Sequence, residues 1–191
     1  LHPVISGFSM HSSAHYRQLL ARLPQIAVAA DQFQVLNSAK DFKSRILSLI
    51  AGATQRIYLI ALYLQDDEVG REILSALYAA KQRNPALDIK VFVDFHRAQR
   101  GLIGKGKQGG NHLMYQTMAA RHEHQIEIYG VPVKGRELLG VLHLKGFIFD
   151  DILLYSGASL NDIYLHQQER YRFDRYHQIT SPELARSMVN Y

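Results

Sequence analysis

The length, composition and charge of the chain exclude several classes of protein. With 191 residues, of which 47% are apolar and 20% charged, the chain is long enough to bury one sizeable core and too apolar to be disordered. It has no apolar run long enough to span a membrane and no cysteine for disulfides or thiolate-bound zinc, which fits a cytoplasmic location. The formal net charge of +5 favours anionic partners such as nucleic acid, a phosphorylated ligand or an acidic membrane surface.

Hydrophobic periodicity and stop signals predict helices and strands that follow an N-terminal arm. Residues 1–14 are expected to be a disordered arm or an attachment outside the fold, and residues 15–191 a single domain. In chain order, we expect helices at residues 15–23 and 38–52, a strand at 56–64, a helix at 69–83, a strand at 88–95, a helix at 112–120, strands at 125–129, 141–149 and 152–156, a short helix at 160–166, a strand at 176–180 and a helix from 182.

Two of these runs indicate the class of fold. RIYLIALYL at residues 56–64 and DIKVFVDF at residues 88–95 are almost continuously apolar, which is typical of strands covered on both faces. The helix between them completes a strand, helix, strand unit, which indicates a parallel α/β sheet. The glycine-rich segment at residues 101–111 contains two lysines, but it lacks the register of a phosphate-binding loop, so we interpret it as a surface loop.

The residues with the most chemical content lie in and just after the strand expected before Asp150. Alternation around an apolar core places His143 and Lys145 on one face of this strand, so both side chains reach the same ligand. Asp150 follows five residues after the lysine, and a turn of small residues then carries Ser159 and Asn161. The sequence therefore predicts one strand and one turn that act on a common ligand.

This grouping suits phosphodiester chemistry. Imidazole is a nucleophile for phosphorus, the lysine is a point cation for nonbridging oxygens, and the hydroxyl and amide of the turn complete an anion pocket. Transfer by this route also needs a second acid or base to protonate the leaving oxygen. The chain contains no second H-x-K, so it holds one half of such a site. No histidine spacing fits a metal site, and neither a metal nor a cofactor is expected.

Two further basic segments are considered for substrate binding. His96, Arg97 and Arg100 directly follow the DIKVFVDF strand, and the carboxyl ends of parallel strands commonly face the ligand. Two arginines there would clamp a diphosphate, although a solvated helix start explains the same residues equally well. In the run ERYRFDRY from Glu169, charged and aromatic residues alternate, and we expect its arginines to pair with acids rather than with substrate.

Several of these residues match a known motif. His143, Lys145 and Asp150 resemble the HxKxxxxD motif of the phospholipase D superfamily. Ser159 and Asn161 resemble its GSxN element, with the glycine shifted by one position. The fold that this resemblance implies is α/β, an αβα sandwich around a mixed, largely parallel sheet.

A closer resemblance is to one family within that superfamily. The segments at residues 61–70 (ALYLQDDEVG), 93–101 (VDFHRAQRG) and 140–177 are similar to the N-terminal half of the phospholipase D-type phosphatidylserine synthases of Gram-negative bacteria. These are CDP-diacylglycerol–serine O-phosphatidyltransferases. The resemblance implies a double displacement without metal or cofactor, in which CMP leaves CDP-diacylglycerol and L-serine attacks the phosphatidyl-enzyme.

The resemblance also implies roles for individual residues. His143 is either the nucleophile or the partnered acid and base, and Lys145 binds the phosphate. Asp150 either orients the histidine pair or makes a structural hydrogen bond at the strand end. The second HxKxxxxD motif of the family belongs to a second α/β half, which we expect from the same full-length chain or from another copy.

The substrate implies a location, and two alternatives remain open. Because CDP-diacylglycerol is a lipid, the resemblance implies a cytoplasmic enzyme that is peripheral at the anionic inner membrane and has no nucleic-acid partner. One alternative is a homodimeric phosphodiesterase or nuclease of the same superfamily, in which each copy donates one H-x-K. The other is a noncatalytic half that binds anionic lipid.

Overall fold

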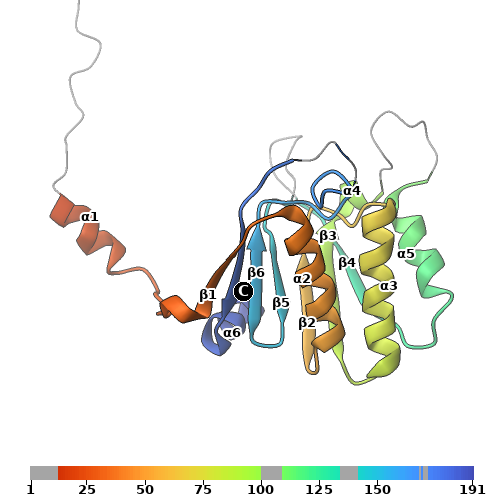
Figure 1. Cartoon of the computed structure of the whole chain (residues 1–191), viewed down its shortest axis with the longest axis horizontal. Helices are drawn as coiled ribbons and strands as arrows, with labels where there is room; N and C mark the ends of the chain where they lie inside the picture. Colours follow the sequence, from red (N-terminus) through yellow and green to blue (C-terminus); the bar gives the residue numbers. More distant parts are fainter. Residues whose placement is uncertain (1–12, 100–108, 134–141, 168, 170–171) are drawn as a thin grey trace, which may run out of the picture.

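One mixed sheet forms the centre of the molecule. A computed structural model describes residues 13–99, 109–133, 142–167, 169 and 172–191. Within this part of the chain, seven strands lie in the order β1-β7-β6-β5-β2-β3-β4 (Figure 1). Their bounds are β1 Phe33–Leu36, β2 Arg56–Ile60, β3 Asp88–Asp94, β4 Glu127–Val131, β5 Gly146–Phe149, β6 Ile152–Ser156 and β7 Tyr176–Thr180. The pairs β2–β3 and β3–β4 are parallel, whereas the other four neighbouring pairs are antiparallel.

The two faces of the sheet are covered unequally. The helices are α1 Ser13–Leu20, the 3₁₀ helix η1 Ala30–Gln32, α2 Ala39–Gly52, α3 Glu68–Arg83, α4 Phe95–Ala98, α5 Asn111–Ala119 and α6 Pro182–Asn190. Phe147 and Phe149 of β5 point into the large core beneath α2 and α3, whereas Ile148 between them packs against Ala185 of α6 on the opposite face. Helix α1 lies away from the sheet (Figure 1), and no side chain of residues 15–25 is buried. None of the described helices has the length and apolarity to cross a membrane.

The predicted α/β class and mixed sheet are confirmed, but three expectations about the fold are wrong. The sheet is not largely parallel, because β5, β6 and β7 succeed one another without a crossover helix, as antiparallel pairing allows. Residues 161–166 form turns rather than a helix. The edge strand β1 was not expected, and three of its four residues are exposed, so its sequence lacks the alternation of a half-buried strand.

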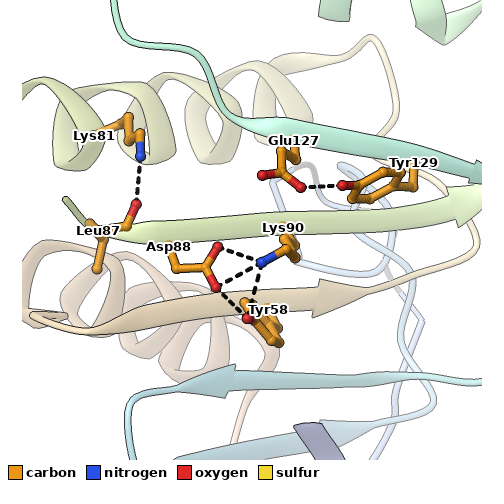
Figure 2. A network of polar contacts seen from close by, with 7 residues as sticks. All are labelled: Tyr58, Lys81, Leu87, Asp88, Lys90, Glu127 and Tyr129. Atoms are coloured by element: carbon orange, nitrogen blue, oxygen red, sulfur yellow. Dashed lines mark hydrogen bonds and ion pairs between the residues drawn. The ribbon is translucent and has the colours of Figure 1, made fainter. Parts of the chain in front are cut away.

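The face that carries α6 is only partly covered. Beside α6, an apolar groove of about 460 Å³ is lined by residues that include Phe92 of β3 and Met188 of α6. Figure 2 shows a polar network on the same face, in which Lys90 donates hydrogen bonds to both carboxylate oxygens of Asp88 at 2.7 and 2.8 Å, and Tyr58 donates to Asp88. The hydrogen bond to Asp88 raises the pKa of Lys90. The charges of this sheet face thus compensate one another next to the apolar groove.

Asp150 fastens the turn between β5 and β6 to the start of β2. Its backbone has a φ of 52°, in the left-handed region that aspartate tolerates better than most residues. Its carboxylate accepts hydrogen bonds from the backbone N–H groups of Thr54, Gln55 and Arg56 at 2.9, 2.8 and 2.9 Å. Burial alone would raise the pKa of Asp150, but these hydrogen bonds outweigh burial and hold that pKa below its usual value.

The substitution Asp150→Asn is expected to lower the free energy of unfolding at pH 7 by about 1–3 kcal/mol, because an amide NH₂ would face backbone donors. The folded-state pKa of Asp150 is depressed, so its carboxylate stabilises the fold above the unfolded value, about 3.9, and this contribution is lost as the pH falls through the folded value. Urea unfolding at pH 7 and in acid measures the difference between wild type and variant, which should shrink in acid. Asp151→Asn is the control, since the side chain of Asp151 has no hydrogen bond or ion pair in the described structure. A difference of equal size at both pH values would contradict this account.

Candidate active site

Most of the predicted site residues gather at the edge of the sheet where the parallel strands β2 and β3 end. Strand β5 runs antiparallel to β2 with Gly146 opposite Ile60, so the residues that enter β5 lie beside the carboxyl end of β2. His143 and Lys145 precede β5, and the expectation of a strand from residue 141 is therefore wrong at its start. Since β2 ends at Ile60, it offers no backbone partner for the residues before Gly146.

The two side chains of the H-x-K pair have different surroundings. His143 is exposed, and among the described residues it makes no hydrogen bond or ion pair. Lys145 is half-buried, and its ammonium group donates a hydrogen bond to the carbonyl of Gly157. The same group lies 5.9 Å from the centroid of the Tyr164 ring. The lysine is thus directed at the turn that begins at Gly157, while the imidazole is left free to contact a ligand.

That turn carries the two other predicted residues of the motif. Ser159 and Asn161 are both buried, with 3% and 6% of their surface exposed. The Oδ1 atom of Asn161 accepts a hydrogen bond from the N–H of Tyr164 at 3.0 Å, and its Nδ2 donates to the Tyr63 hydroxyl and to Oε1 of Gln65, both at 3.3 Å. Tyr63 and Gln65, which sequence analysis did not single out, therefore orient this amide.

The first basic segment lies at the same edge. Helix α4 begins directly after β3 and contains His96 and Arg97. His96 is exposed and meets Phe95 edge to face at 5.4 Å between ring centroids, and Arg97 is half-buried. Arg100 lies outside the described residues. The structure thus brings His96 and Arg97, but not Asp150, to the edge that holds Lys145.

A buried aspartate that sequence analysis did not single out joins these segments. Asp94, the last residue of β3, is 0% exposed. Its Oδ1 accepts a hydrogen bond from the N–H of Arg97 at 2.8 Å and so caps α4, and its Oδ2 accepts from the N–H of Leu142 at 3.0 Å. One carboxylate therefore links the basic helix to the residue before His143. The signal was present in the sequence, because an acid at the end of an apolar strand needs compensating donors.

A second pair of acids fixes the loop that follows β2. Asp67 caps α3 by accepting from the N–H of Gly70, and its other oxygen accepts from the N–H of Asp162, both at 2.9 Å. Asp162 in turn accepts from the N–H of Val69 at 2.9 Å. Burial raises the pKa of Asp67 to about 6, against the lowering effect of its hydrogen bonds. Gly70 is needed for close approach, since a Cβ atom there would lie 1.8 Å from the carbonyl oxygen of Gln65.

Asp150 is the motif residue that the structure separates from the others. It follows Phe149, which lies opposite Ile57 near the start of β2, whereas Lys145 precedes Gly146 at the other end of β5. The catalytic role predicted for Asp150 therefore lacks geometric support. Its hydrogen bonds to the start of β2 support the structural alternative.

The expectation that the arginines from Glu169 onward pair with acids is wrong for Arg172. Its Nη1 donates a hydrogen bond to the Tyr164 hydroxyl at 3.1 Å, and its guanidinium carbon lies 5.4 Å from the centroid of that ring. The ion pairs found in the described residues are Lys43–Glu72, Arg71–Asp66 and Lys90–Asp88. Arg172 thus belongs to the surroundings of Lys145 rather than to an internal ion pair.

The geometry defines the class of site, and a family model identifies the family. A cationic sheet edge with an unpaired imidazole is suited to phosphate esters, and no group of three metal-binding side chains occurs in the described structure. The chain belongs to the phospholipase D-like family, because residues 46–187 match the family model described as "Cardiolipin synthase, PLD-like domain".

Relatives within this family include two named enzymes. The CDP-diacylglycerol–serine O-phosphatidyltransferase of Haemophilus influenzae is 51% identical over 179 residues, which cover 91% of this chain and 39% of the relative. The enzyme of the same name from Escherichia coli is 48% identical over 177 residues, which cover 92% of this chain and 39% of the relative. The predicted resemblance is thus confirmed, and the chain spans about two fifths of the length of these relatives.

Solved structures agree with these relatives. The crystal structure of phosphatidylserine synthase from Haemophilus influenzae Rd KW20 matches with a TM-score of 0.87 at 48% identity, covering 95% of this chain and 40% of that chain. NucT from Helicobacter pylori matches with a TM-score of 0.61 at 14% identity, covering 83% of this chain and 90% of that chain. The second likeness shows the fold alone.

The substitution Asp94→Asn is expected to loosen the attachment of Leu142, because an amide nitrogen would replace one of the two acceptor oxygens. We expect a loss of about 1–3 kcal/mol in the free energy of unfolding and faster amide exchange at Leu142 or Arg97 than elsewhere in the fold. Hydrogen exchange followed by NMR measures this. Asp88→Asn, at the other end of the same strand, is the control. Uniform acceleration along β3 would contradict the linking role of Asp94.

Proposed function

We propose that this chain provides one half of the active site of a CDP-diacylglycerol–serine O-phosphatidyltransferase, which transfers the phosphatidyl group of CDP-diacylglycerol to L-serine and releases CMP. The observation that carries the proposal is the identity of 51% and 48% with two enzymes of that name over nine tenths of the chain. The shared sheet edge of His143, Lys145 and Asn161 supplies chemistry that fits such a transfer.

In the proposed reaction, a histidine nitrogen attacks the phosphorus of the phosphatidyl group, and the bond from that phosphorus to the CMP oxygen breaks. CMP leaves with a proton from an acid on the opposite side. The serine hydroxyl oxygen then attacks the phosphatidyl-histidine and gives its proton to the group that protonated CMP, which frees the imidazole. His143 is either the nucleophile or that acid and base.

The remaining residues bind and orient the substrate. The ammonium group of Lys145 neutralises the nonbridging oxygens of the reacting phosphate. Because a charge-assisted contact in a partly buried site is stronger than one in water, the half-buried position of Lys145 favours this role. We assign substrate binding to Ser159, Asn161, His96, Arg97 and Arg100, and a structural role to Asp150.

The second histidine of this mechanism is not in the chain. No other H-x-K occurs in the 191 residues, and the matched region is 39% of the length of the relatives. Leu142 and Leu144 flank His143 and line the apolar groove beside α6. A second half that brings its histidine to His143 would therefore cover this groove, whether it comes from the same full-length chain or from another copy.

The proposed substrate requires contact with a membrane. CDP-diacylglycerol is a lipid, and none of the described helices is suited to cross a bilayer. The net charge of +5 favours adsorption to anionic lipid. We therefore propose a peripheral position on the cytoplasmic face of the inner membrane.

The substitution His143→Ala in the full-length protein is expected to lower serine-dependent CMP release from CDP-diacylglycerol by at least about 10³-fold, because either proposed role of the imidazole is then lost. The assay follows CMP with the lipid presented in mixed micelles. His124→Ala is the control, since His124 precedes β4 at the opposite edge of the sheet.

Two outcomes would contradict the proposal. CMP release that does not depend on serine would exclude the transferase. Cleavage of DNA by this chain, lost in His143→Ala, would favour the homodimeric nuclease, whose fold is represented by NucT. Binding to anionic vesicles without any turnover by the full-length protein would favour a noncatalytic lipid-binding half.

A further inference from the structure

The lysine of the candidate site shares a tyrosine with a second cation. The ammonium group of Lys145 lies 5.9 Å from the centroid of the Tyr164 ring, and the guanidinium carbon of Arg172 lies 5.4 Å from the same point. Both distances are within the range of cation–π attraction. Neither cation takes part in an ion pair with a carboxylate in the described structure. Two positive groups are thus held at one ring without a protein counterion.

Tyr164 is well placed to hold both cations because it is fixed itself. Its backbone N–H donates to Oδ1 of Asn161 at 3.0 Å, and its half-buried ring packs against the main core. Its hydroxyl accepts a hydrogen bond from Nη1 of Arg172 at 3.1 Å. The tyrosine therefore connects the asparagine, the lysine and the arginine of this edge.

Arg172 is exposed yet restrained. Its backbone N–H donates to the carbonyl of Ile163 at 3.1 Å, and its side chain is anchored on Tyr164. A guanidinium group has five N–H donors, and the hydroxyl of Tyr164 takes only one of them. The remaining donors are available to a ligand, and the loss of side-chain entropy on binding is already partly incurred in the free protein.

We propose that Arg172 binds the second phosphate of a substrate diphosphate, next to the phosphate held by Lys145. Like charges that share one site repel each other, and a ligand with two adjacent phosphates relieves that repulsion at both. A planar guanidinium group also matches phosphate oxygens in bidentate fashion. The inference rests on the proposed function, because it assigns to Arg172 the phosphate that departs as part of CMP.

The first experiment is kinetic and uses the full-length protein. Arg172→Ala is expected to lower kcat/KM for CDP-diacylglycerol by about tenfold or more, as expected for the loss of a charge-assisted hydrogen bond. Tyr164→Phe retains the ring for Lys145 and removes the hydroxyl that anchors Arg172, so a smaller loss in the same direction is expected. Arg175→Ala is the matched control, because Arg175 is an exposed arginine on the same segment whose side chain has no contact with Tyr164 in the described structure. Circular dichroism checks that each variant is folded.

The second experiment measures binding, so that it does not depend on turnover. Calorimetry at fixed ionic strength compares inorganic pyrophosphate with inorganic phosphate. Wild type and Arg175→Ala are expected to bind pyrophosphate at least about tenfold more tightly than phosphate, whereas Arg172→Ala should lose most of this preference.

The two experiments separate failure of this inference from failure of the proposed function. If wild type releases no CMP from CDP-diacylglycerol, the proposed function fails, and the preference for pyrophosphate still decides the role of Arg172. If wild type is active but does not prefer pyrophosphate, the inference is overturned and the function stands. Equal losses in Arg172→Ala and Arg175→Ala would also overturn it, because they would indicate a general effect of positive charge.

Discussion

The buried carboxylate of Asp94 determines where the candidate site is built. A buried charge is tolerated only when hydrogen bonds compensate it, and the two donors here are the N–H groups of Arg97 and Leu142. These donors come from segments 45 residues apart in the chain, as their numbers show. By satisfying one aspartate, the chain brings the basic helix α4 and the approach to His143 to the end of the same strand.

The parts of the fold that local sequence signals determine could be predicted. Helix α2 begins after the cap Ser38, and its buried residues recur at helical spacing, so that its bounds were evident without the structure. The start of β5 was not evident, because the apolar alternation of the sequence continues upstream of Gly146. A strand extends only as far as its neighbour, and β2 ends at Ile60. Strand length is thus a nonlocal property, and sequence periodicity alone overestimates it.

The motif itself contains a similar ambiguity. His143, Lys145 and Asp150 are close in the sequence, and their spacing alone does not tell whether they meet. In an extended strand each residue advances by about 3.3 Å, so the four residues of β5 place the lysine and the aspartate at opposite edges of the sheet. The shared motif therefore combines a chemical end with a structural end. Asn161 and Tyr164 show the reverse case, since hydrogen bonds within a turn bring a predicted residue and an unexpected one together.

The unequal cover of the sheet explains how this edge can serve as part of a divided active site. On one face, α2 and α3 complete a core that includes the contact of Phe42 with Phe147 and Tyr176, and this core fixes the backbone of β5 and β7. On the other face, the groove beside α6 remains open next to the residues that flank His143. The imidazole thus has a rigid backbone and no protein partner among the described residues. Such an arrangement preorganises one set of catalytic groups while leaving the proton donor to be supplied from outside, so that a site assembled from two halves needs little rearrangement of either.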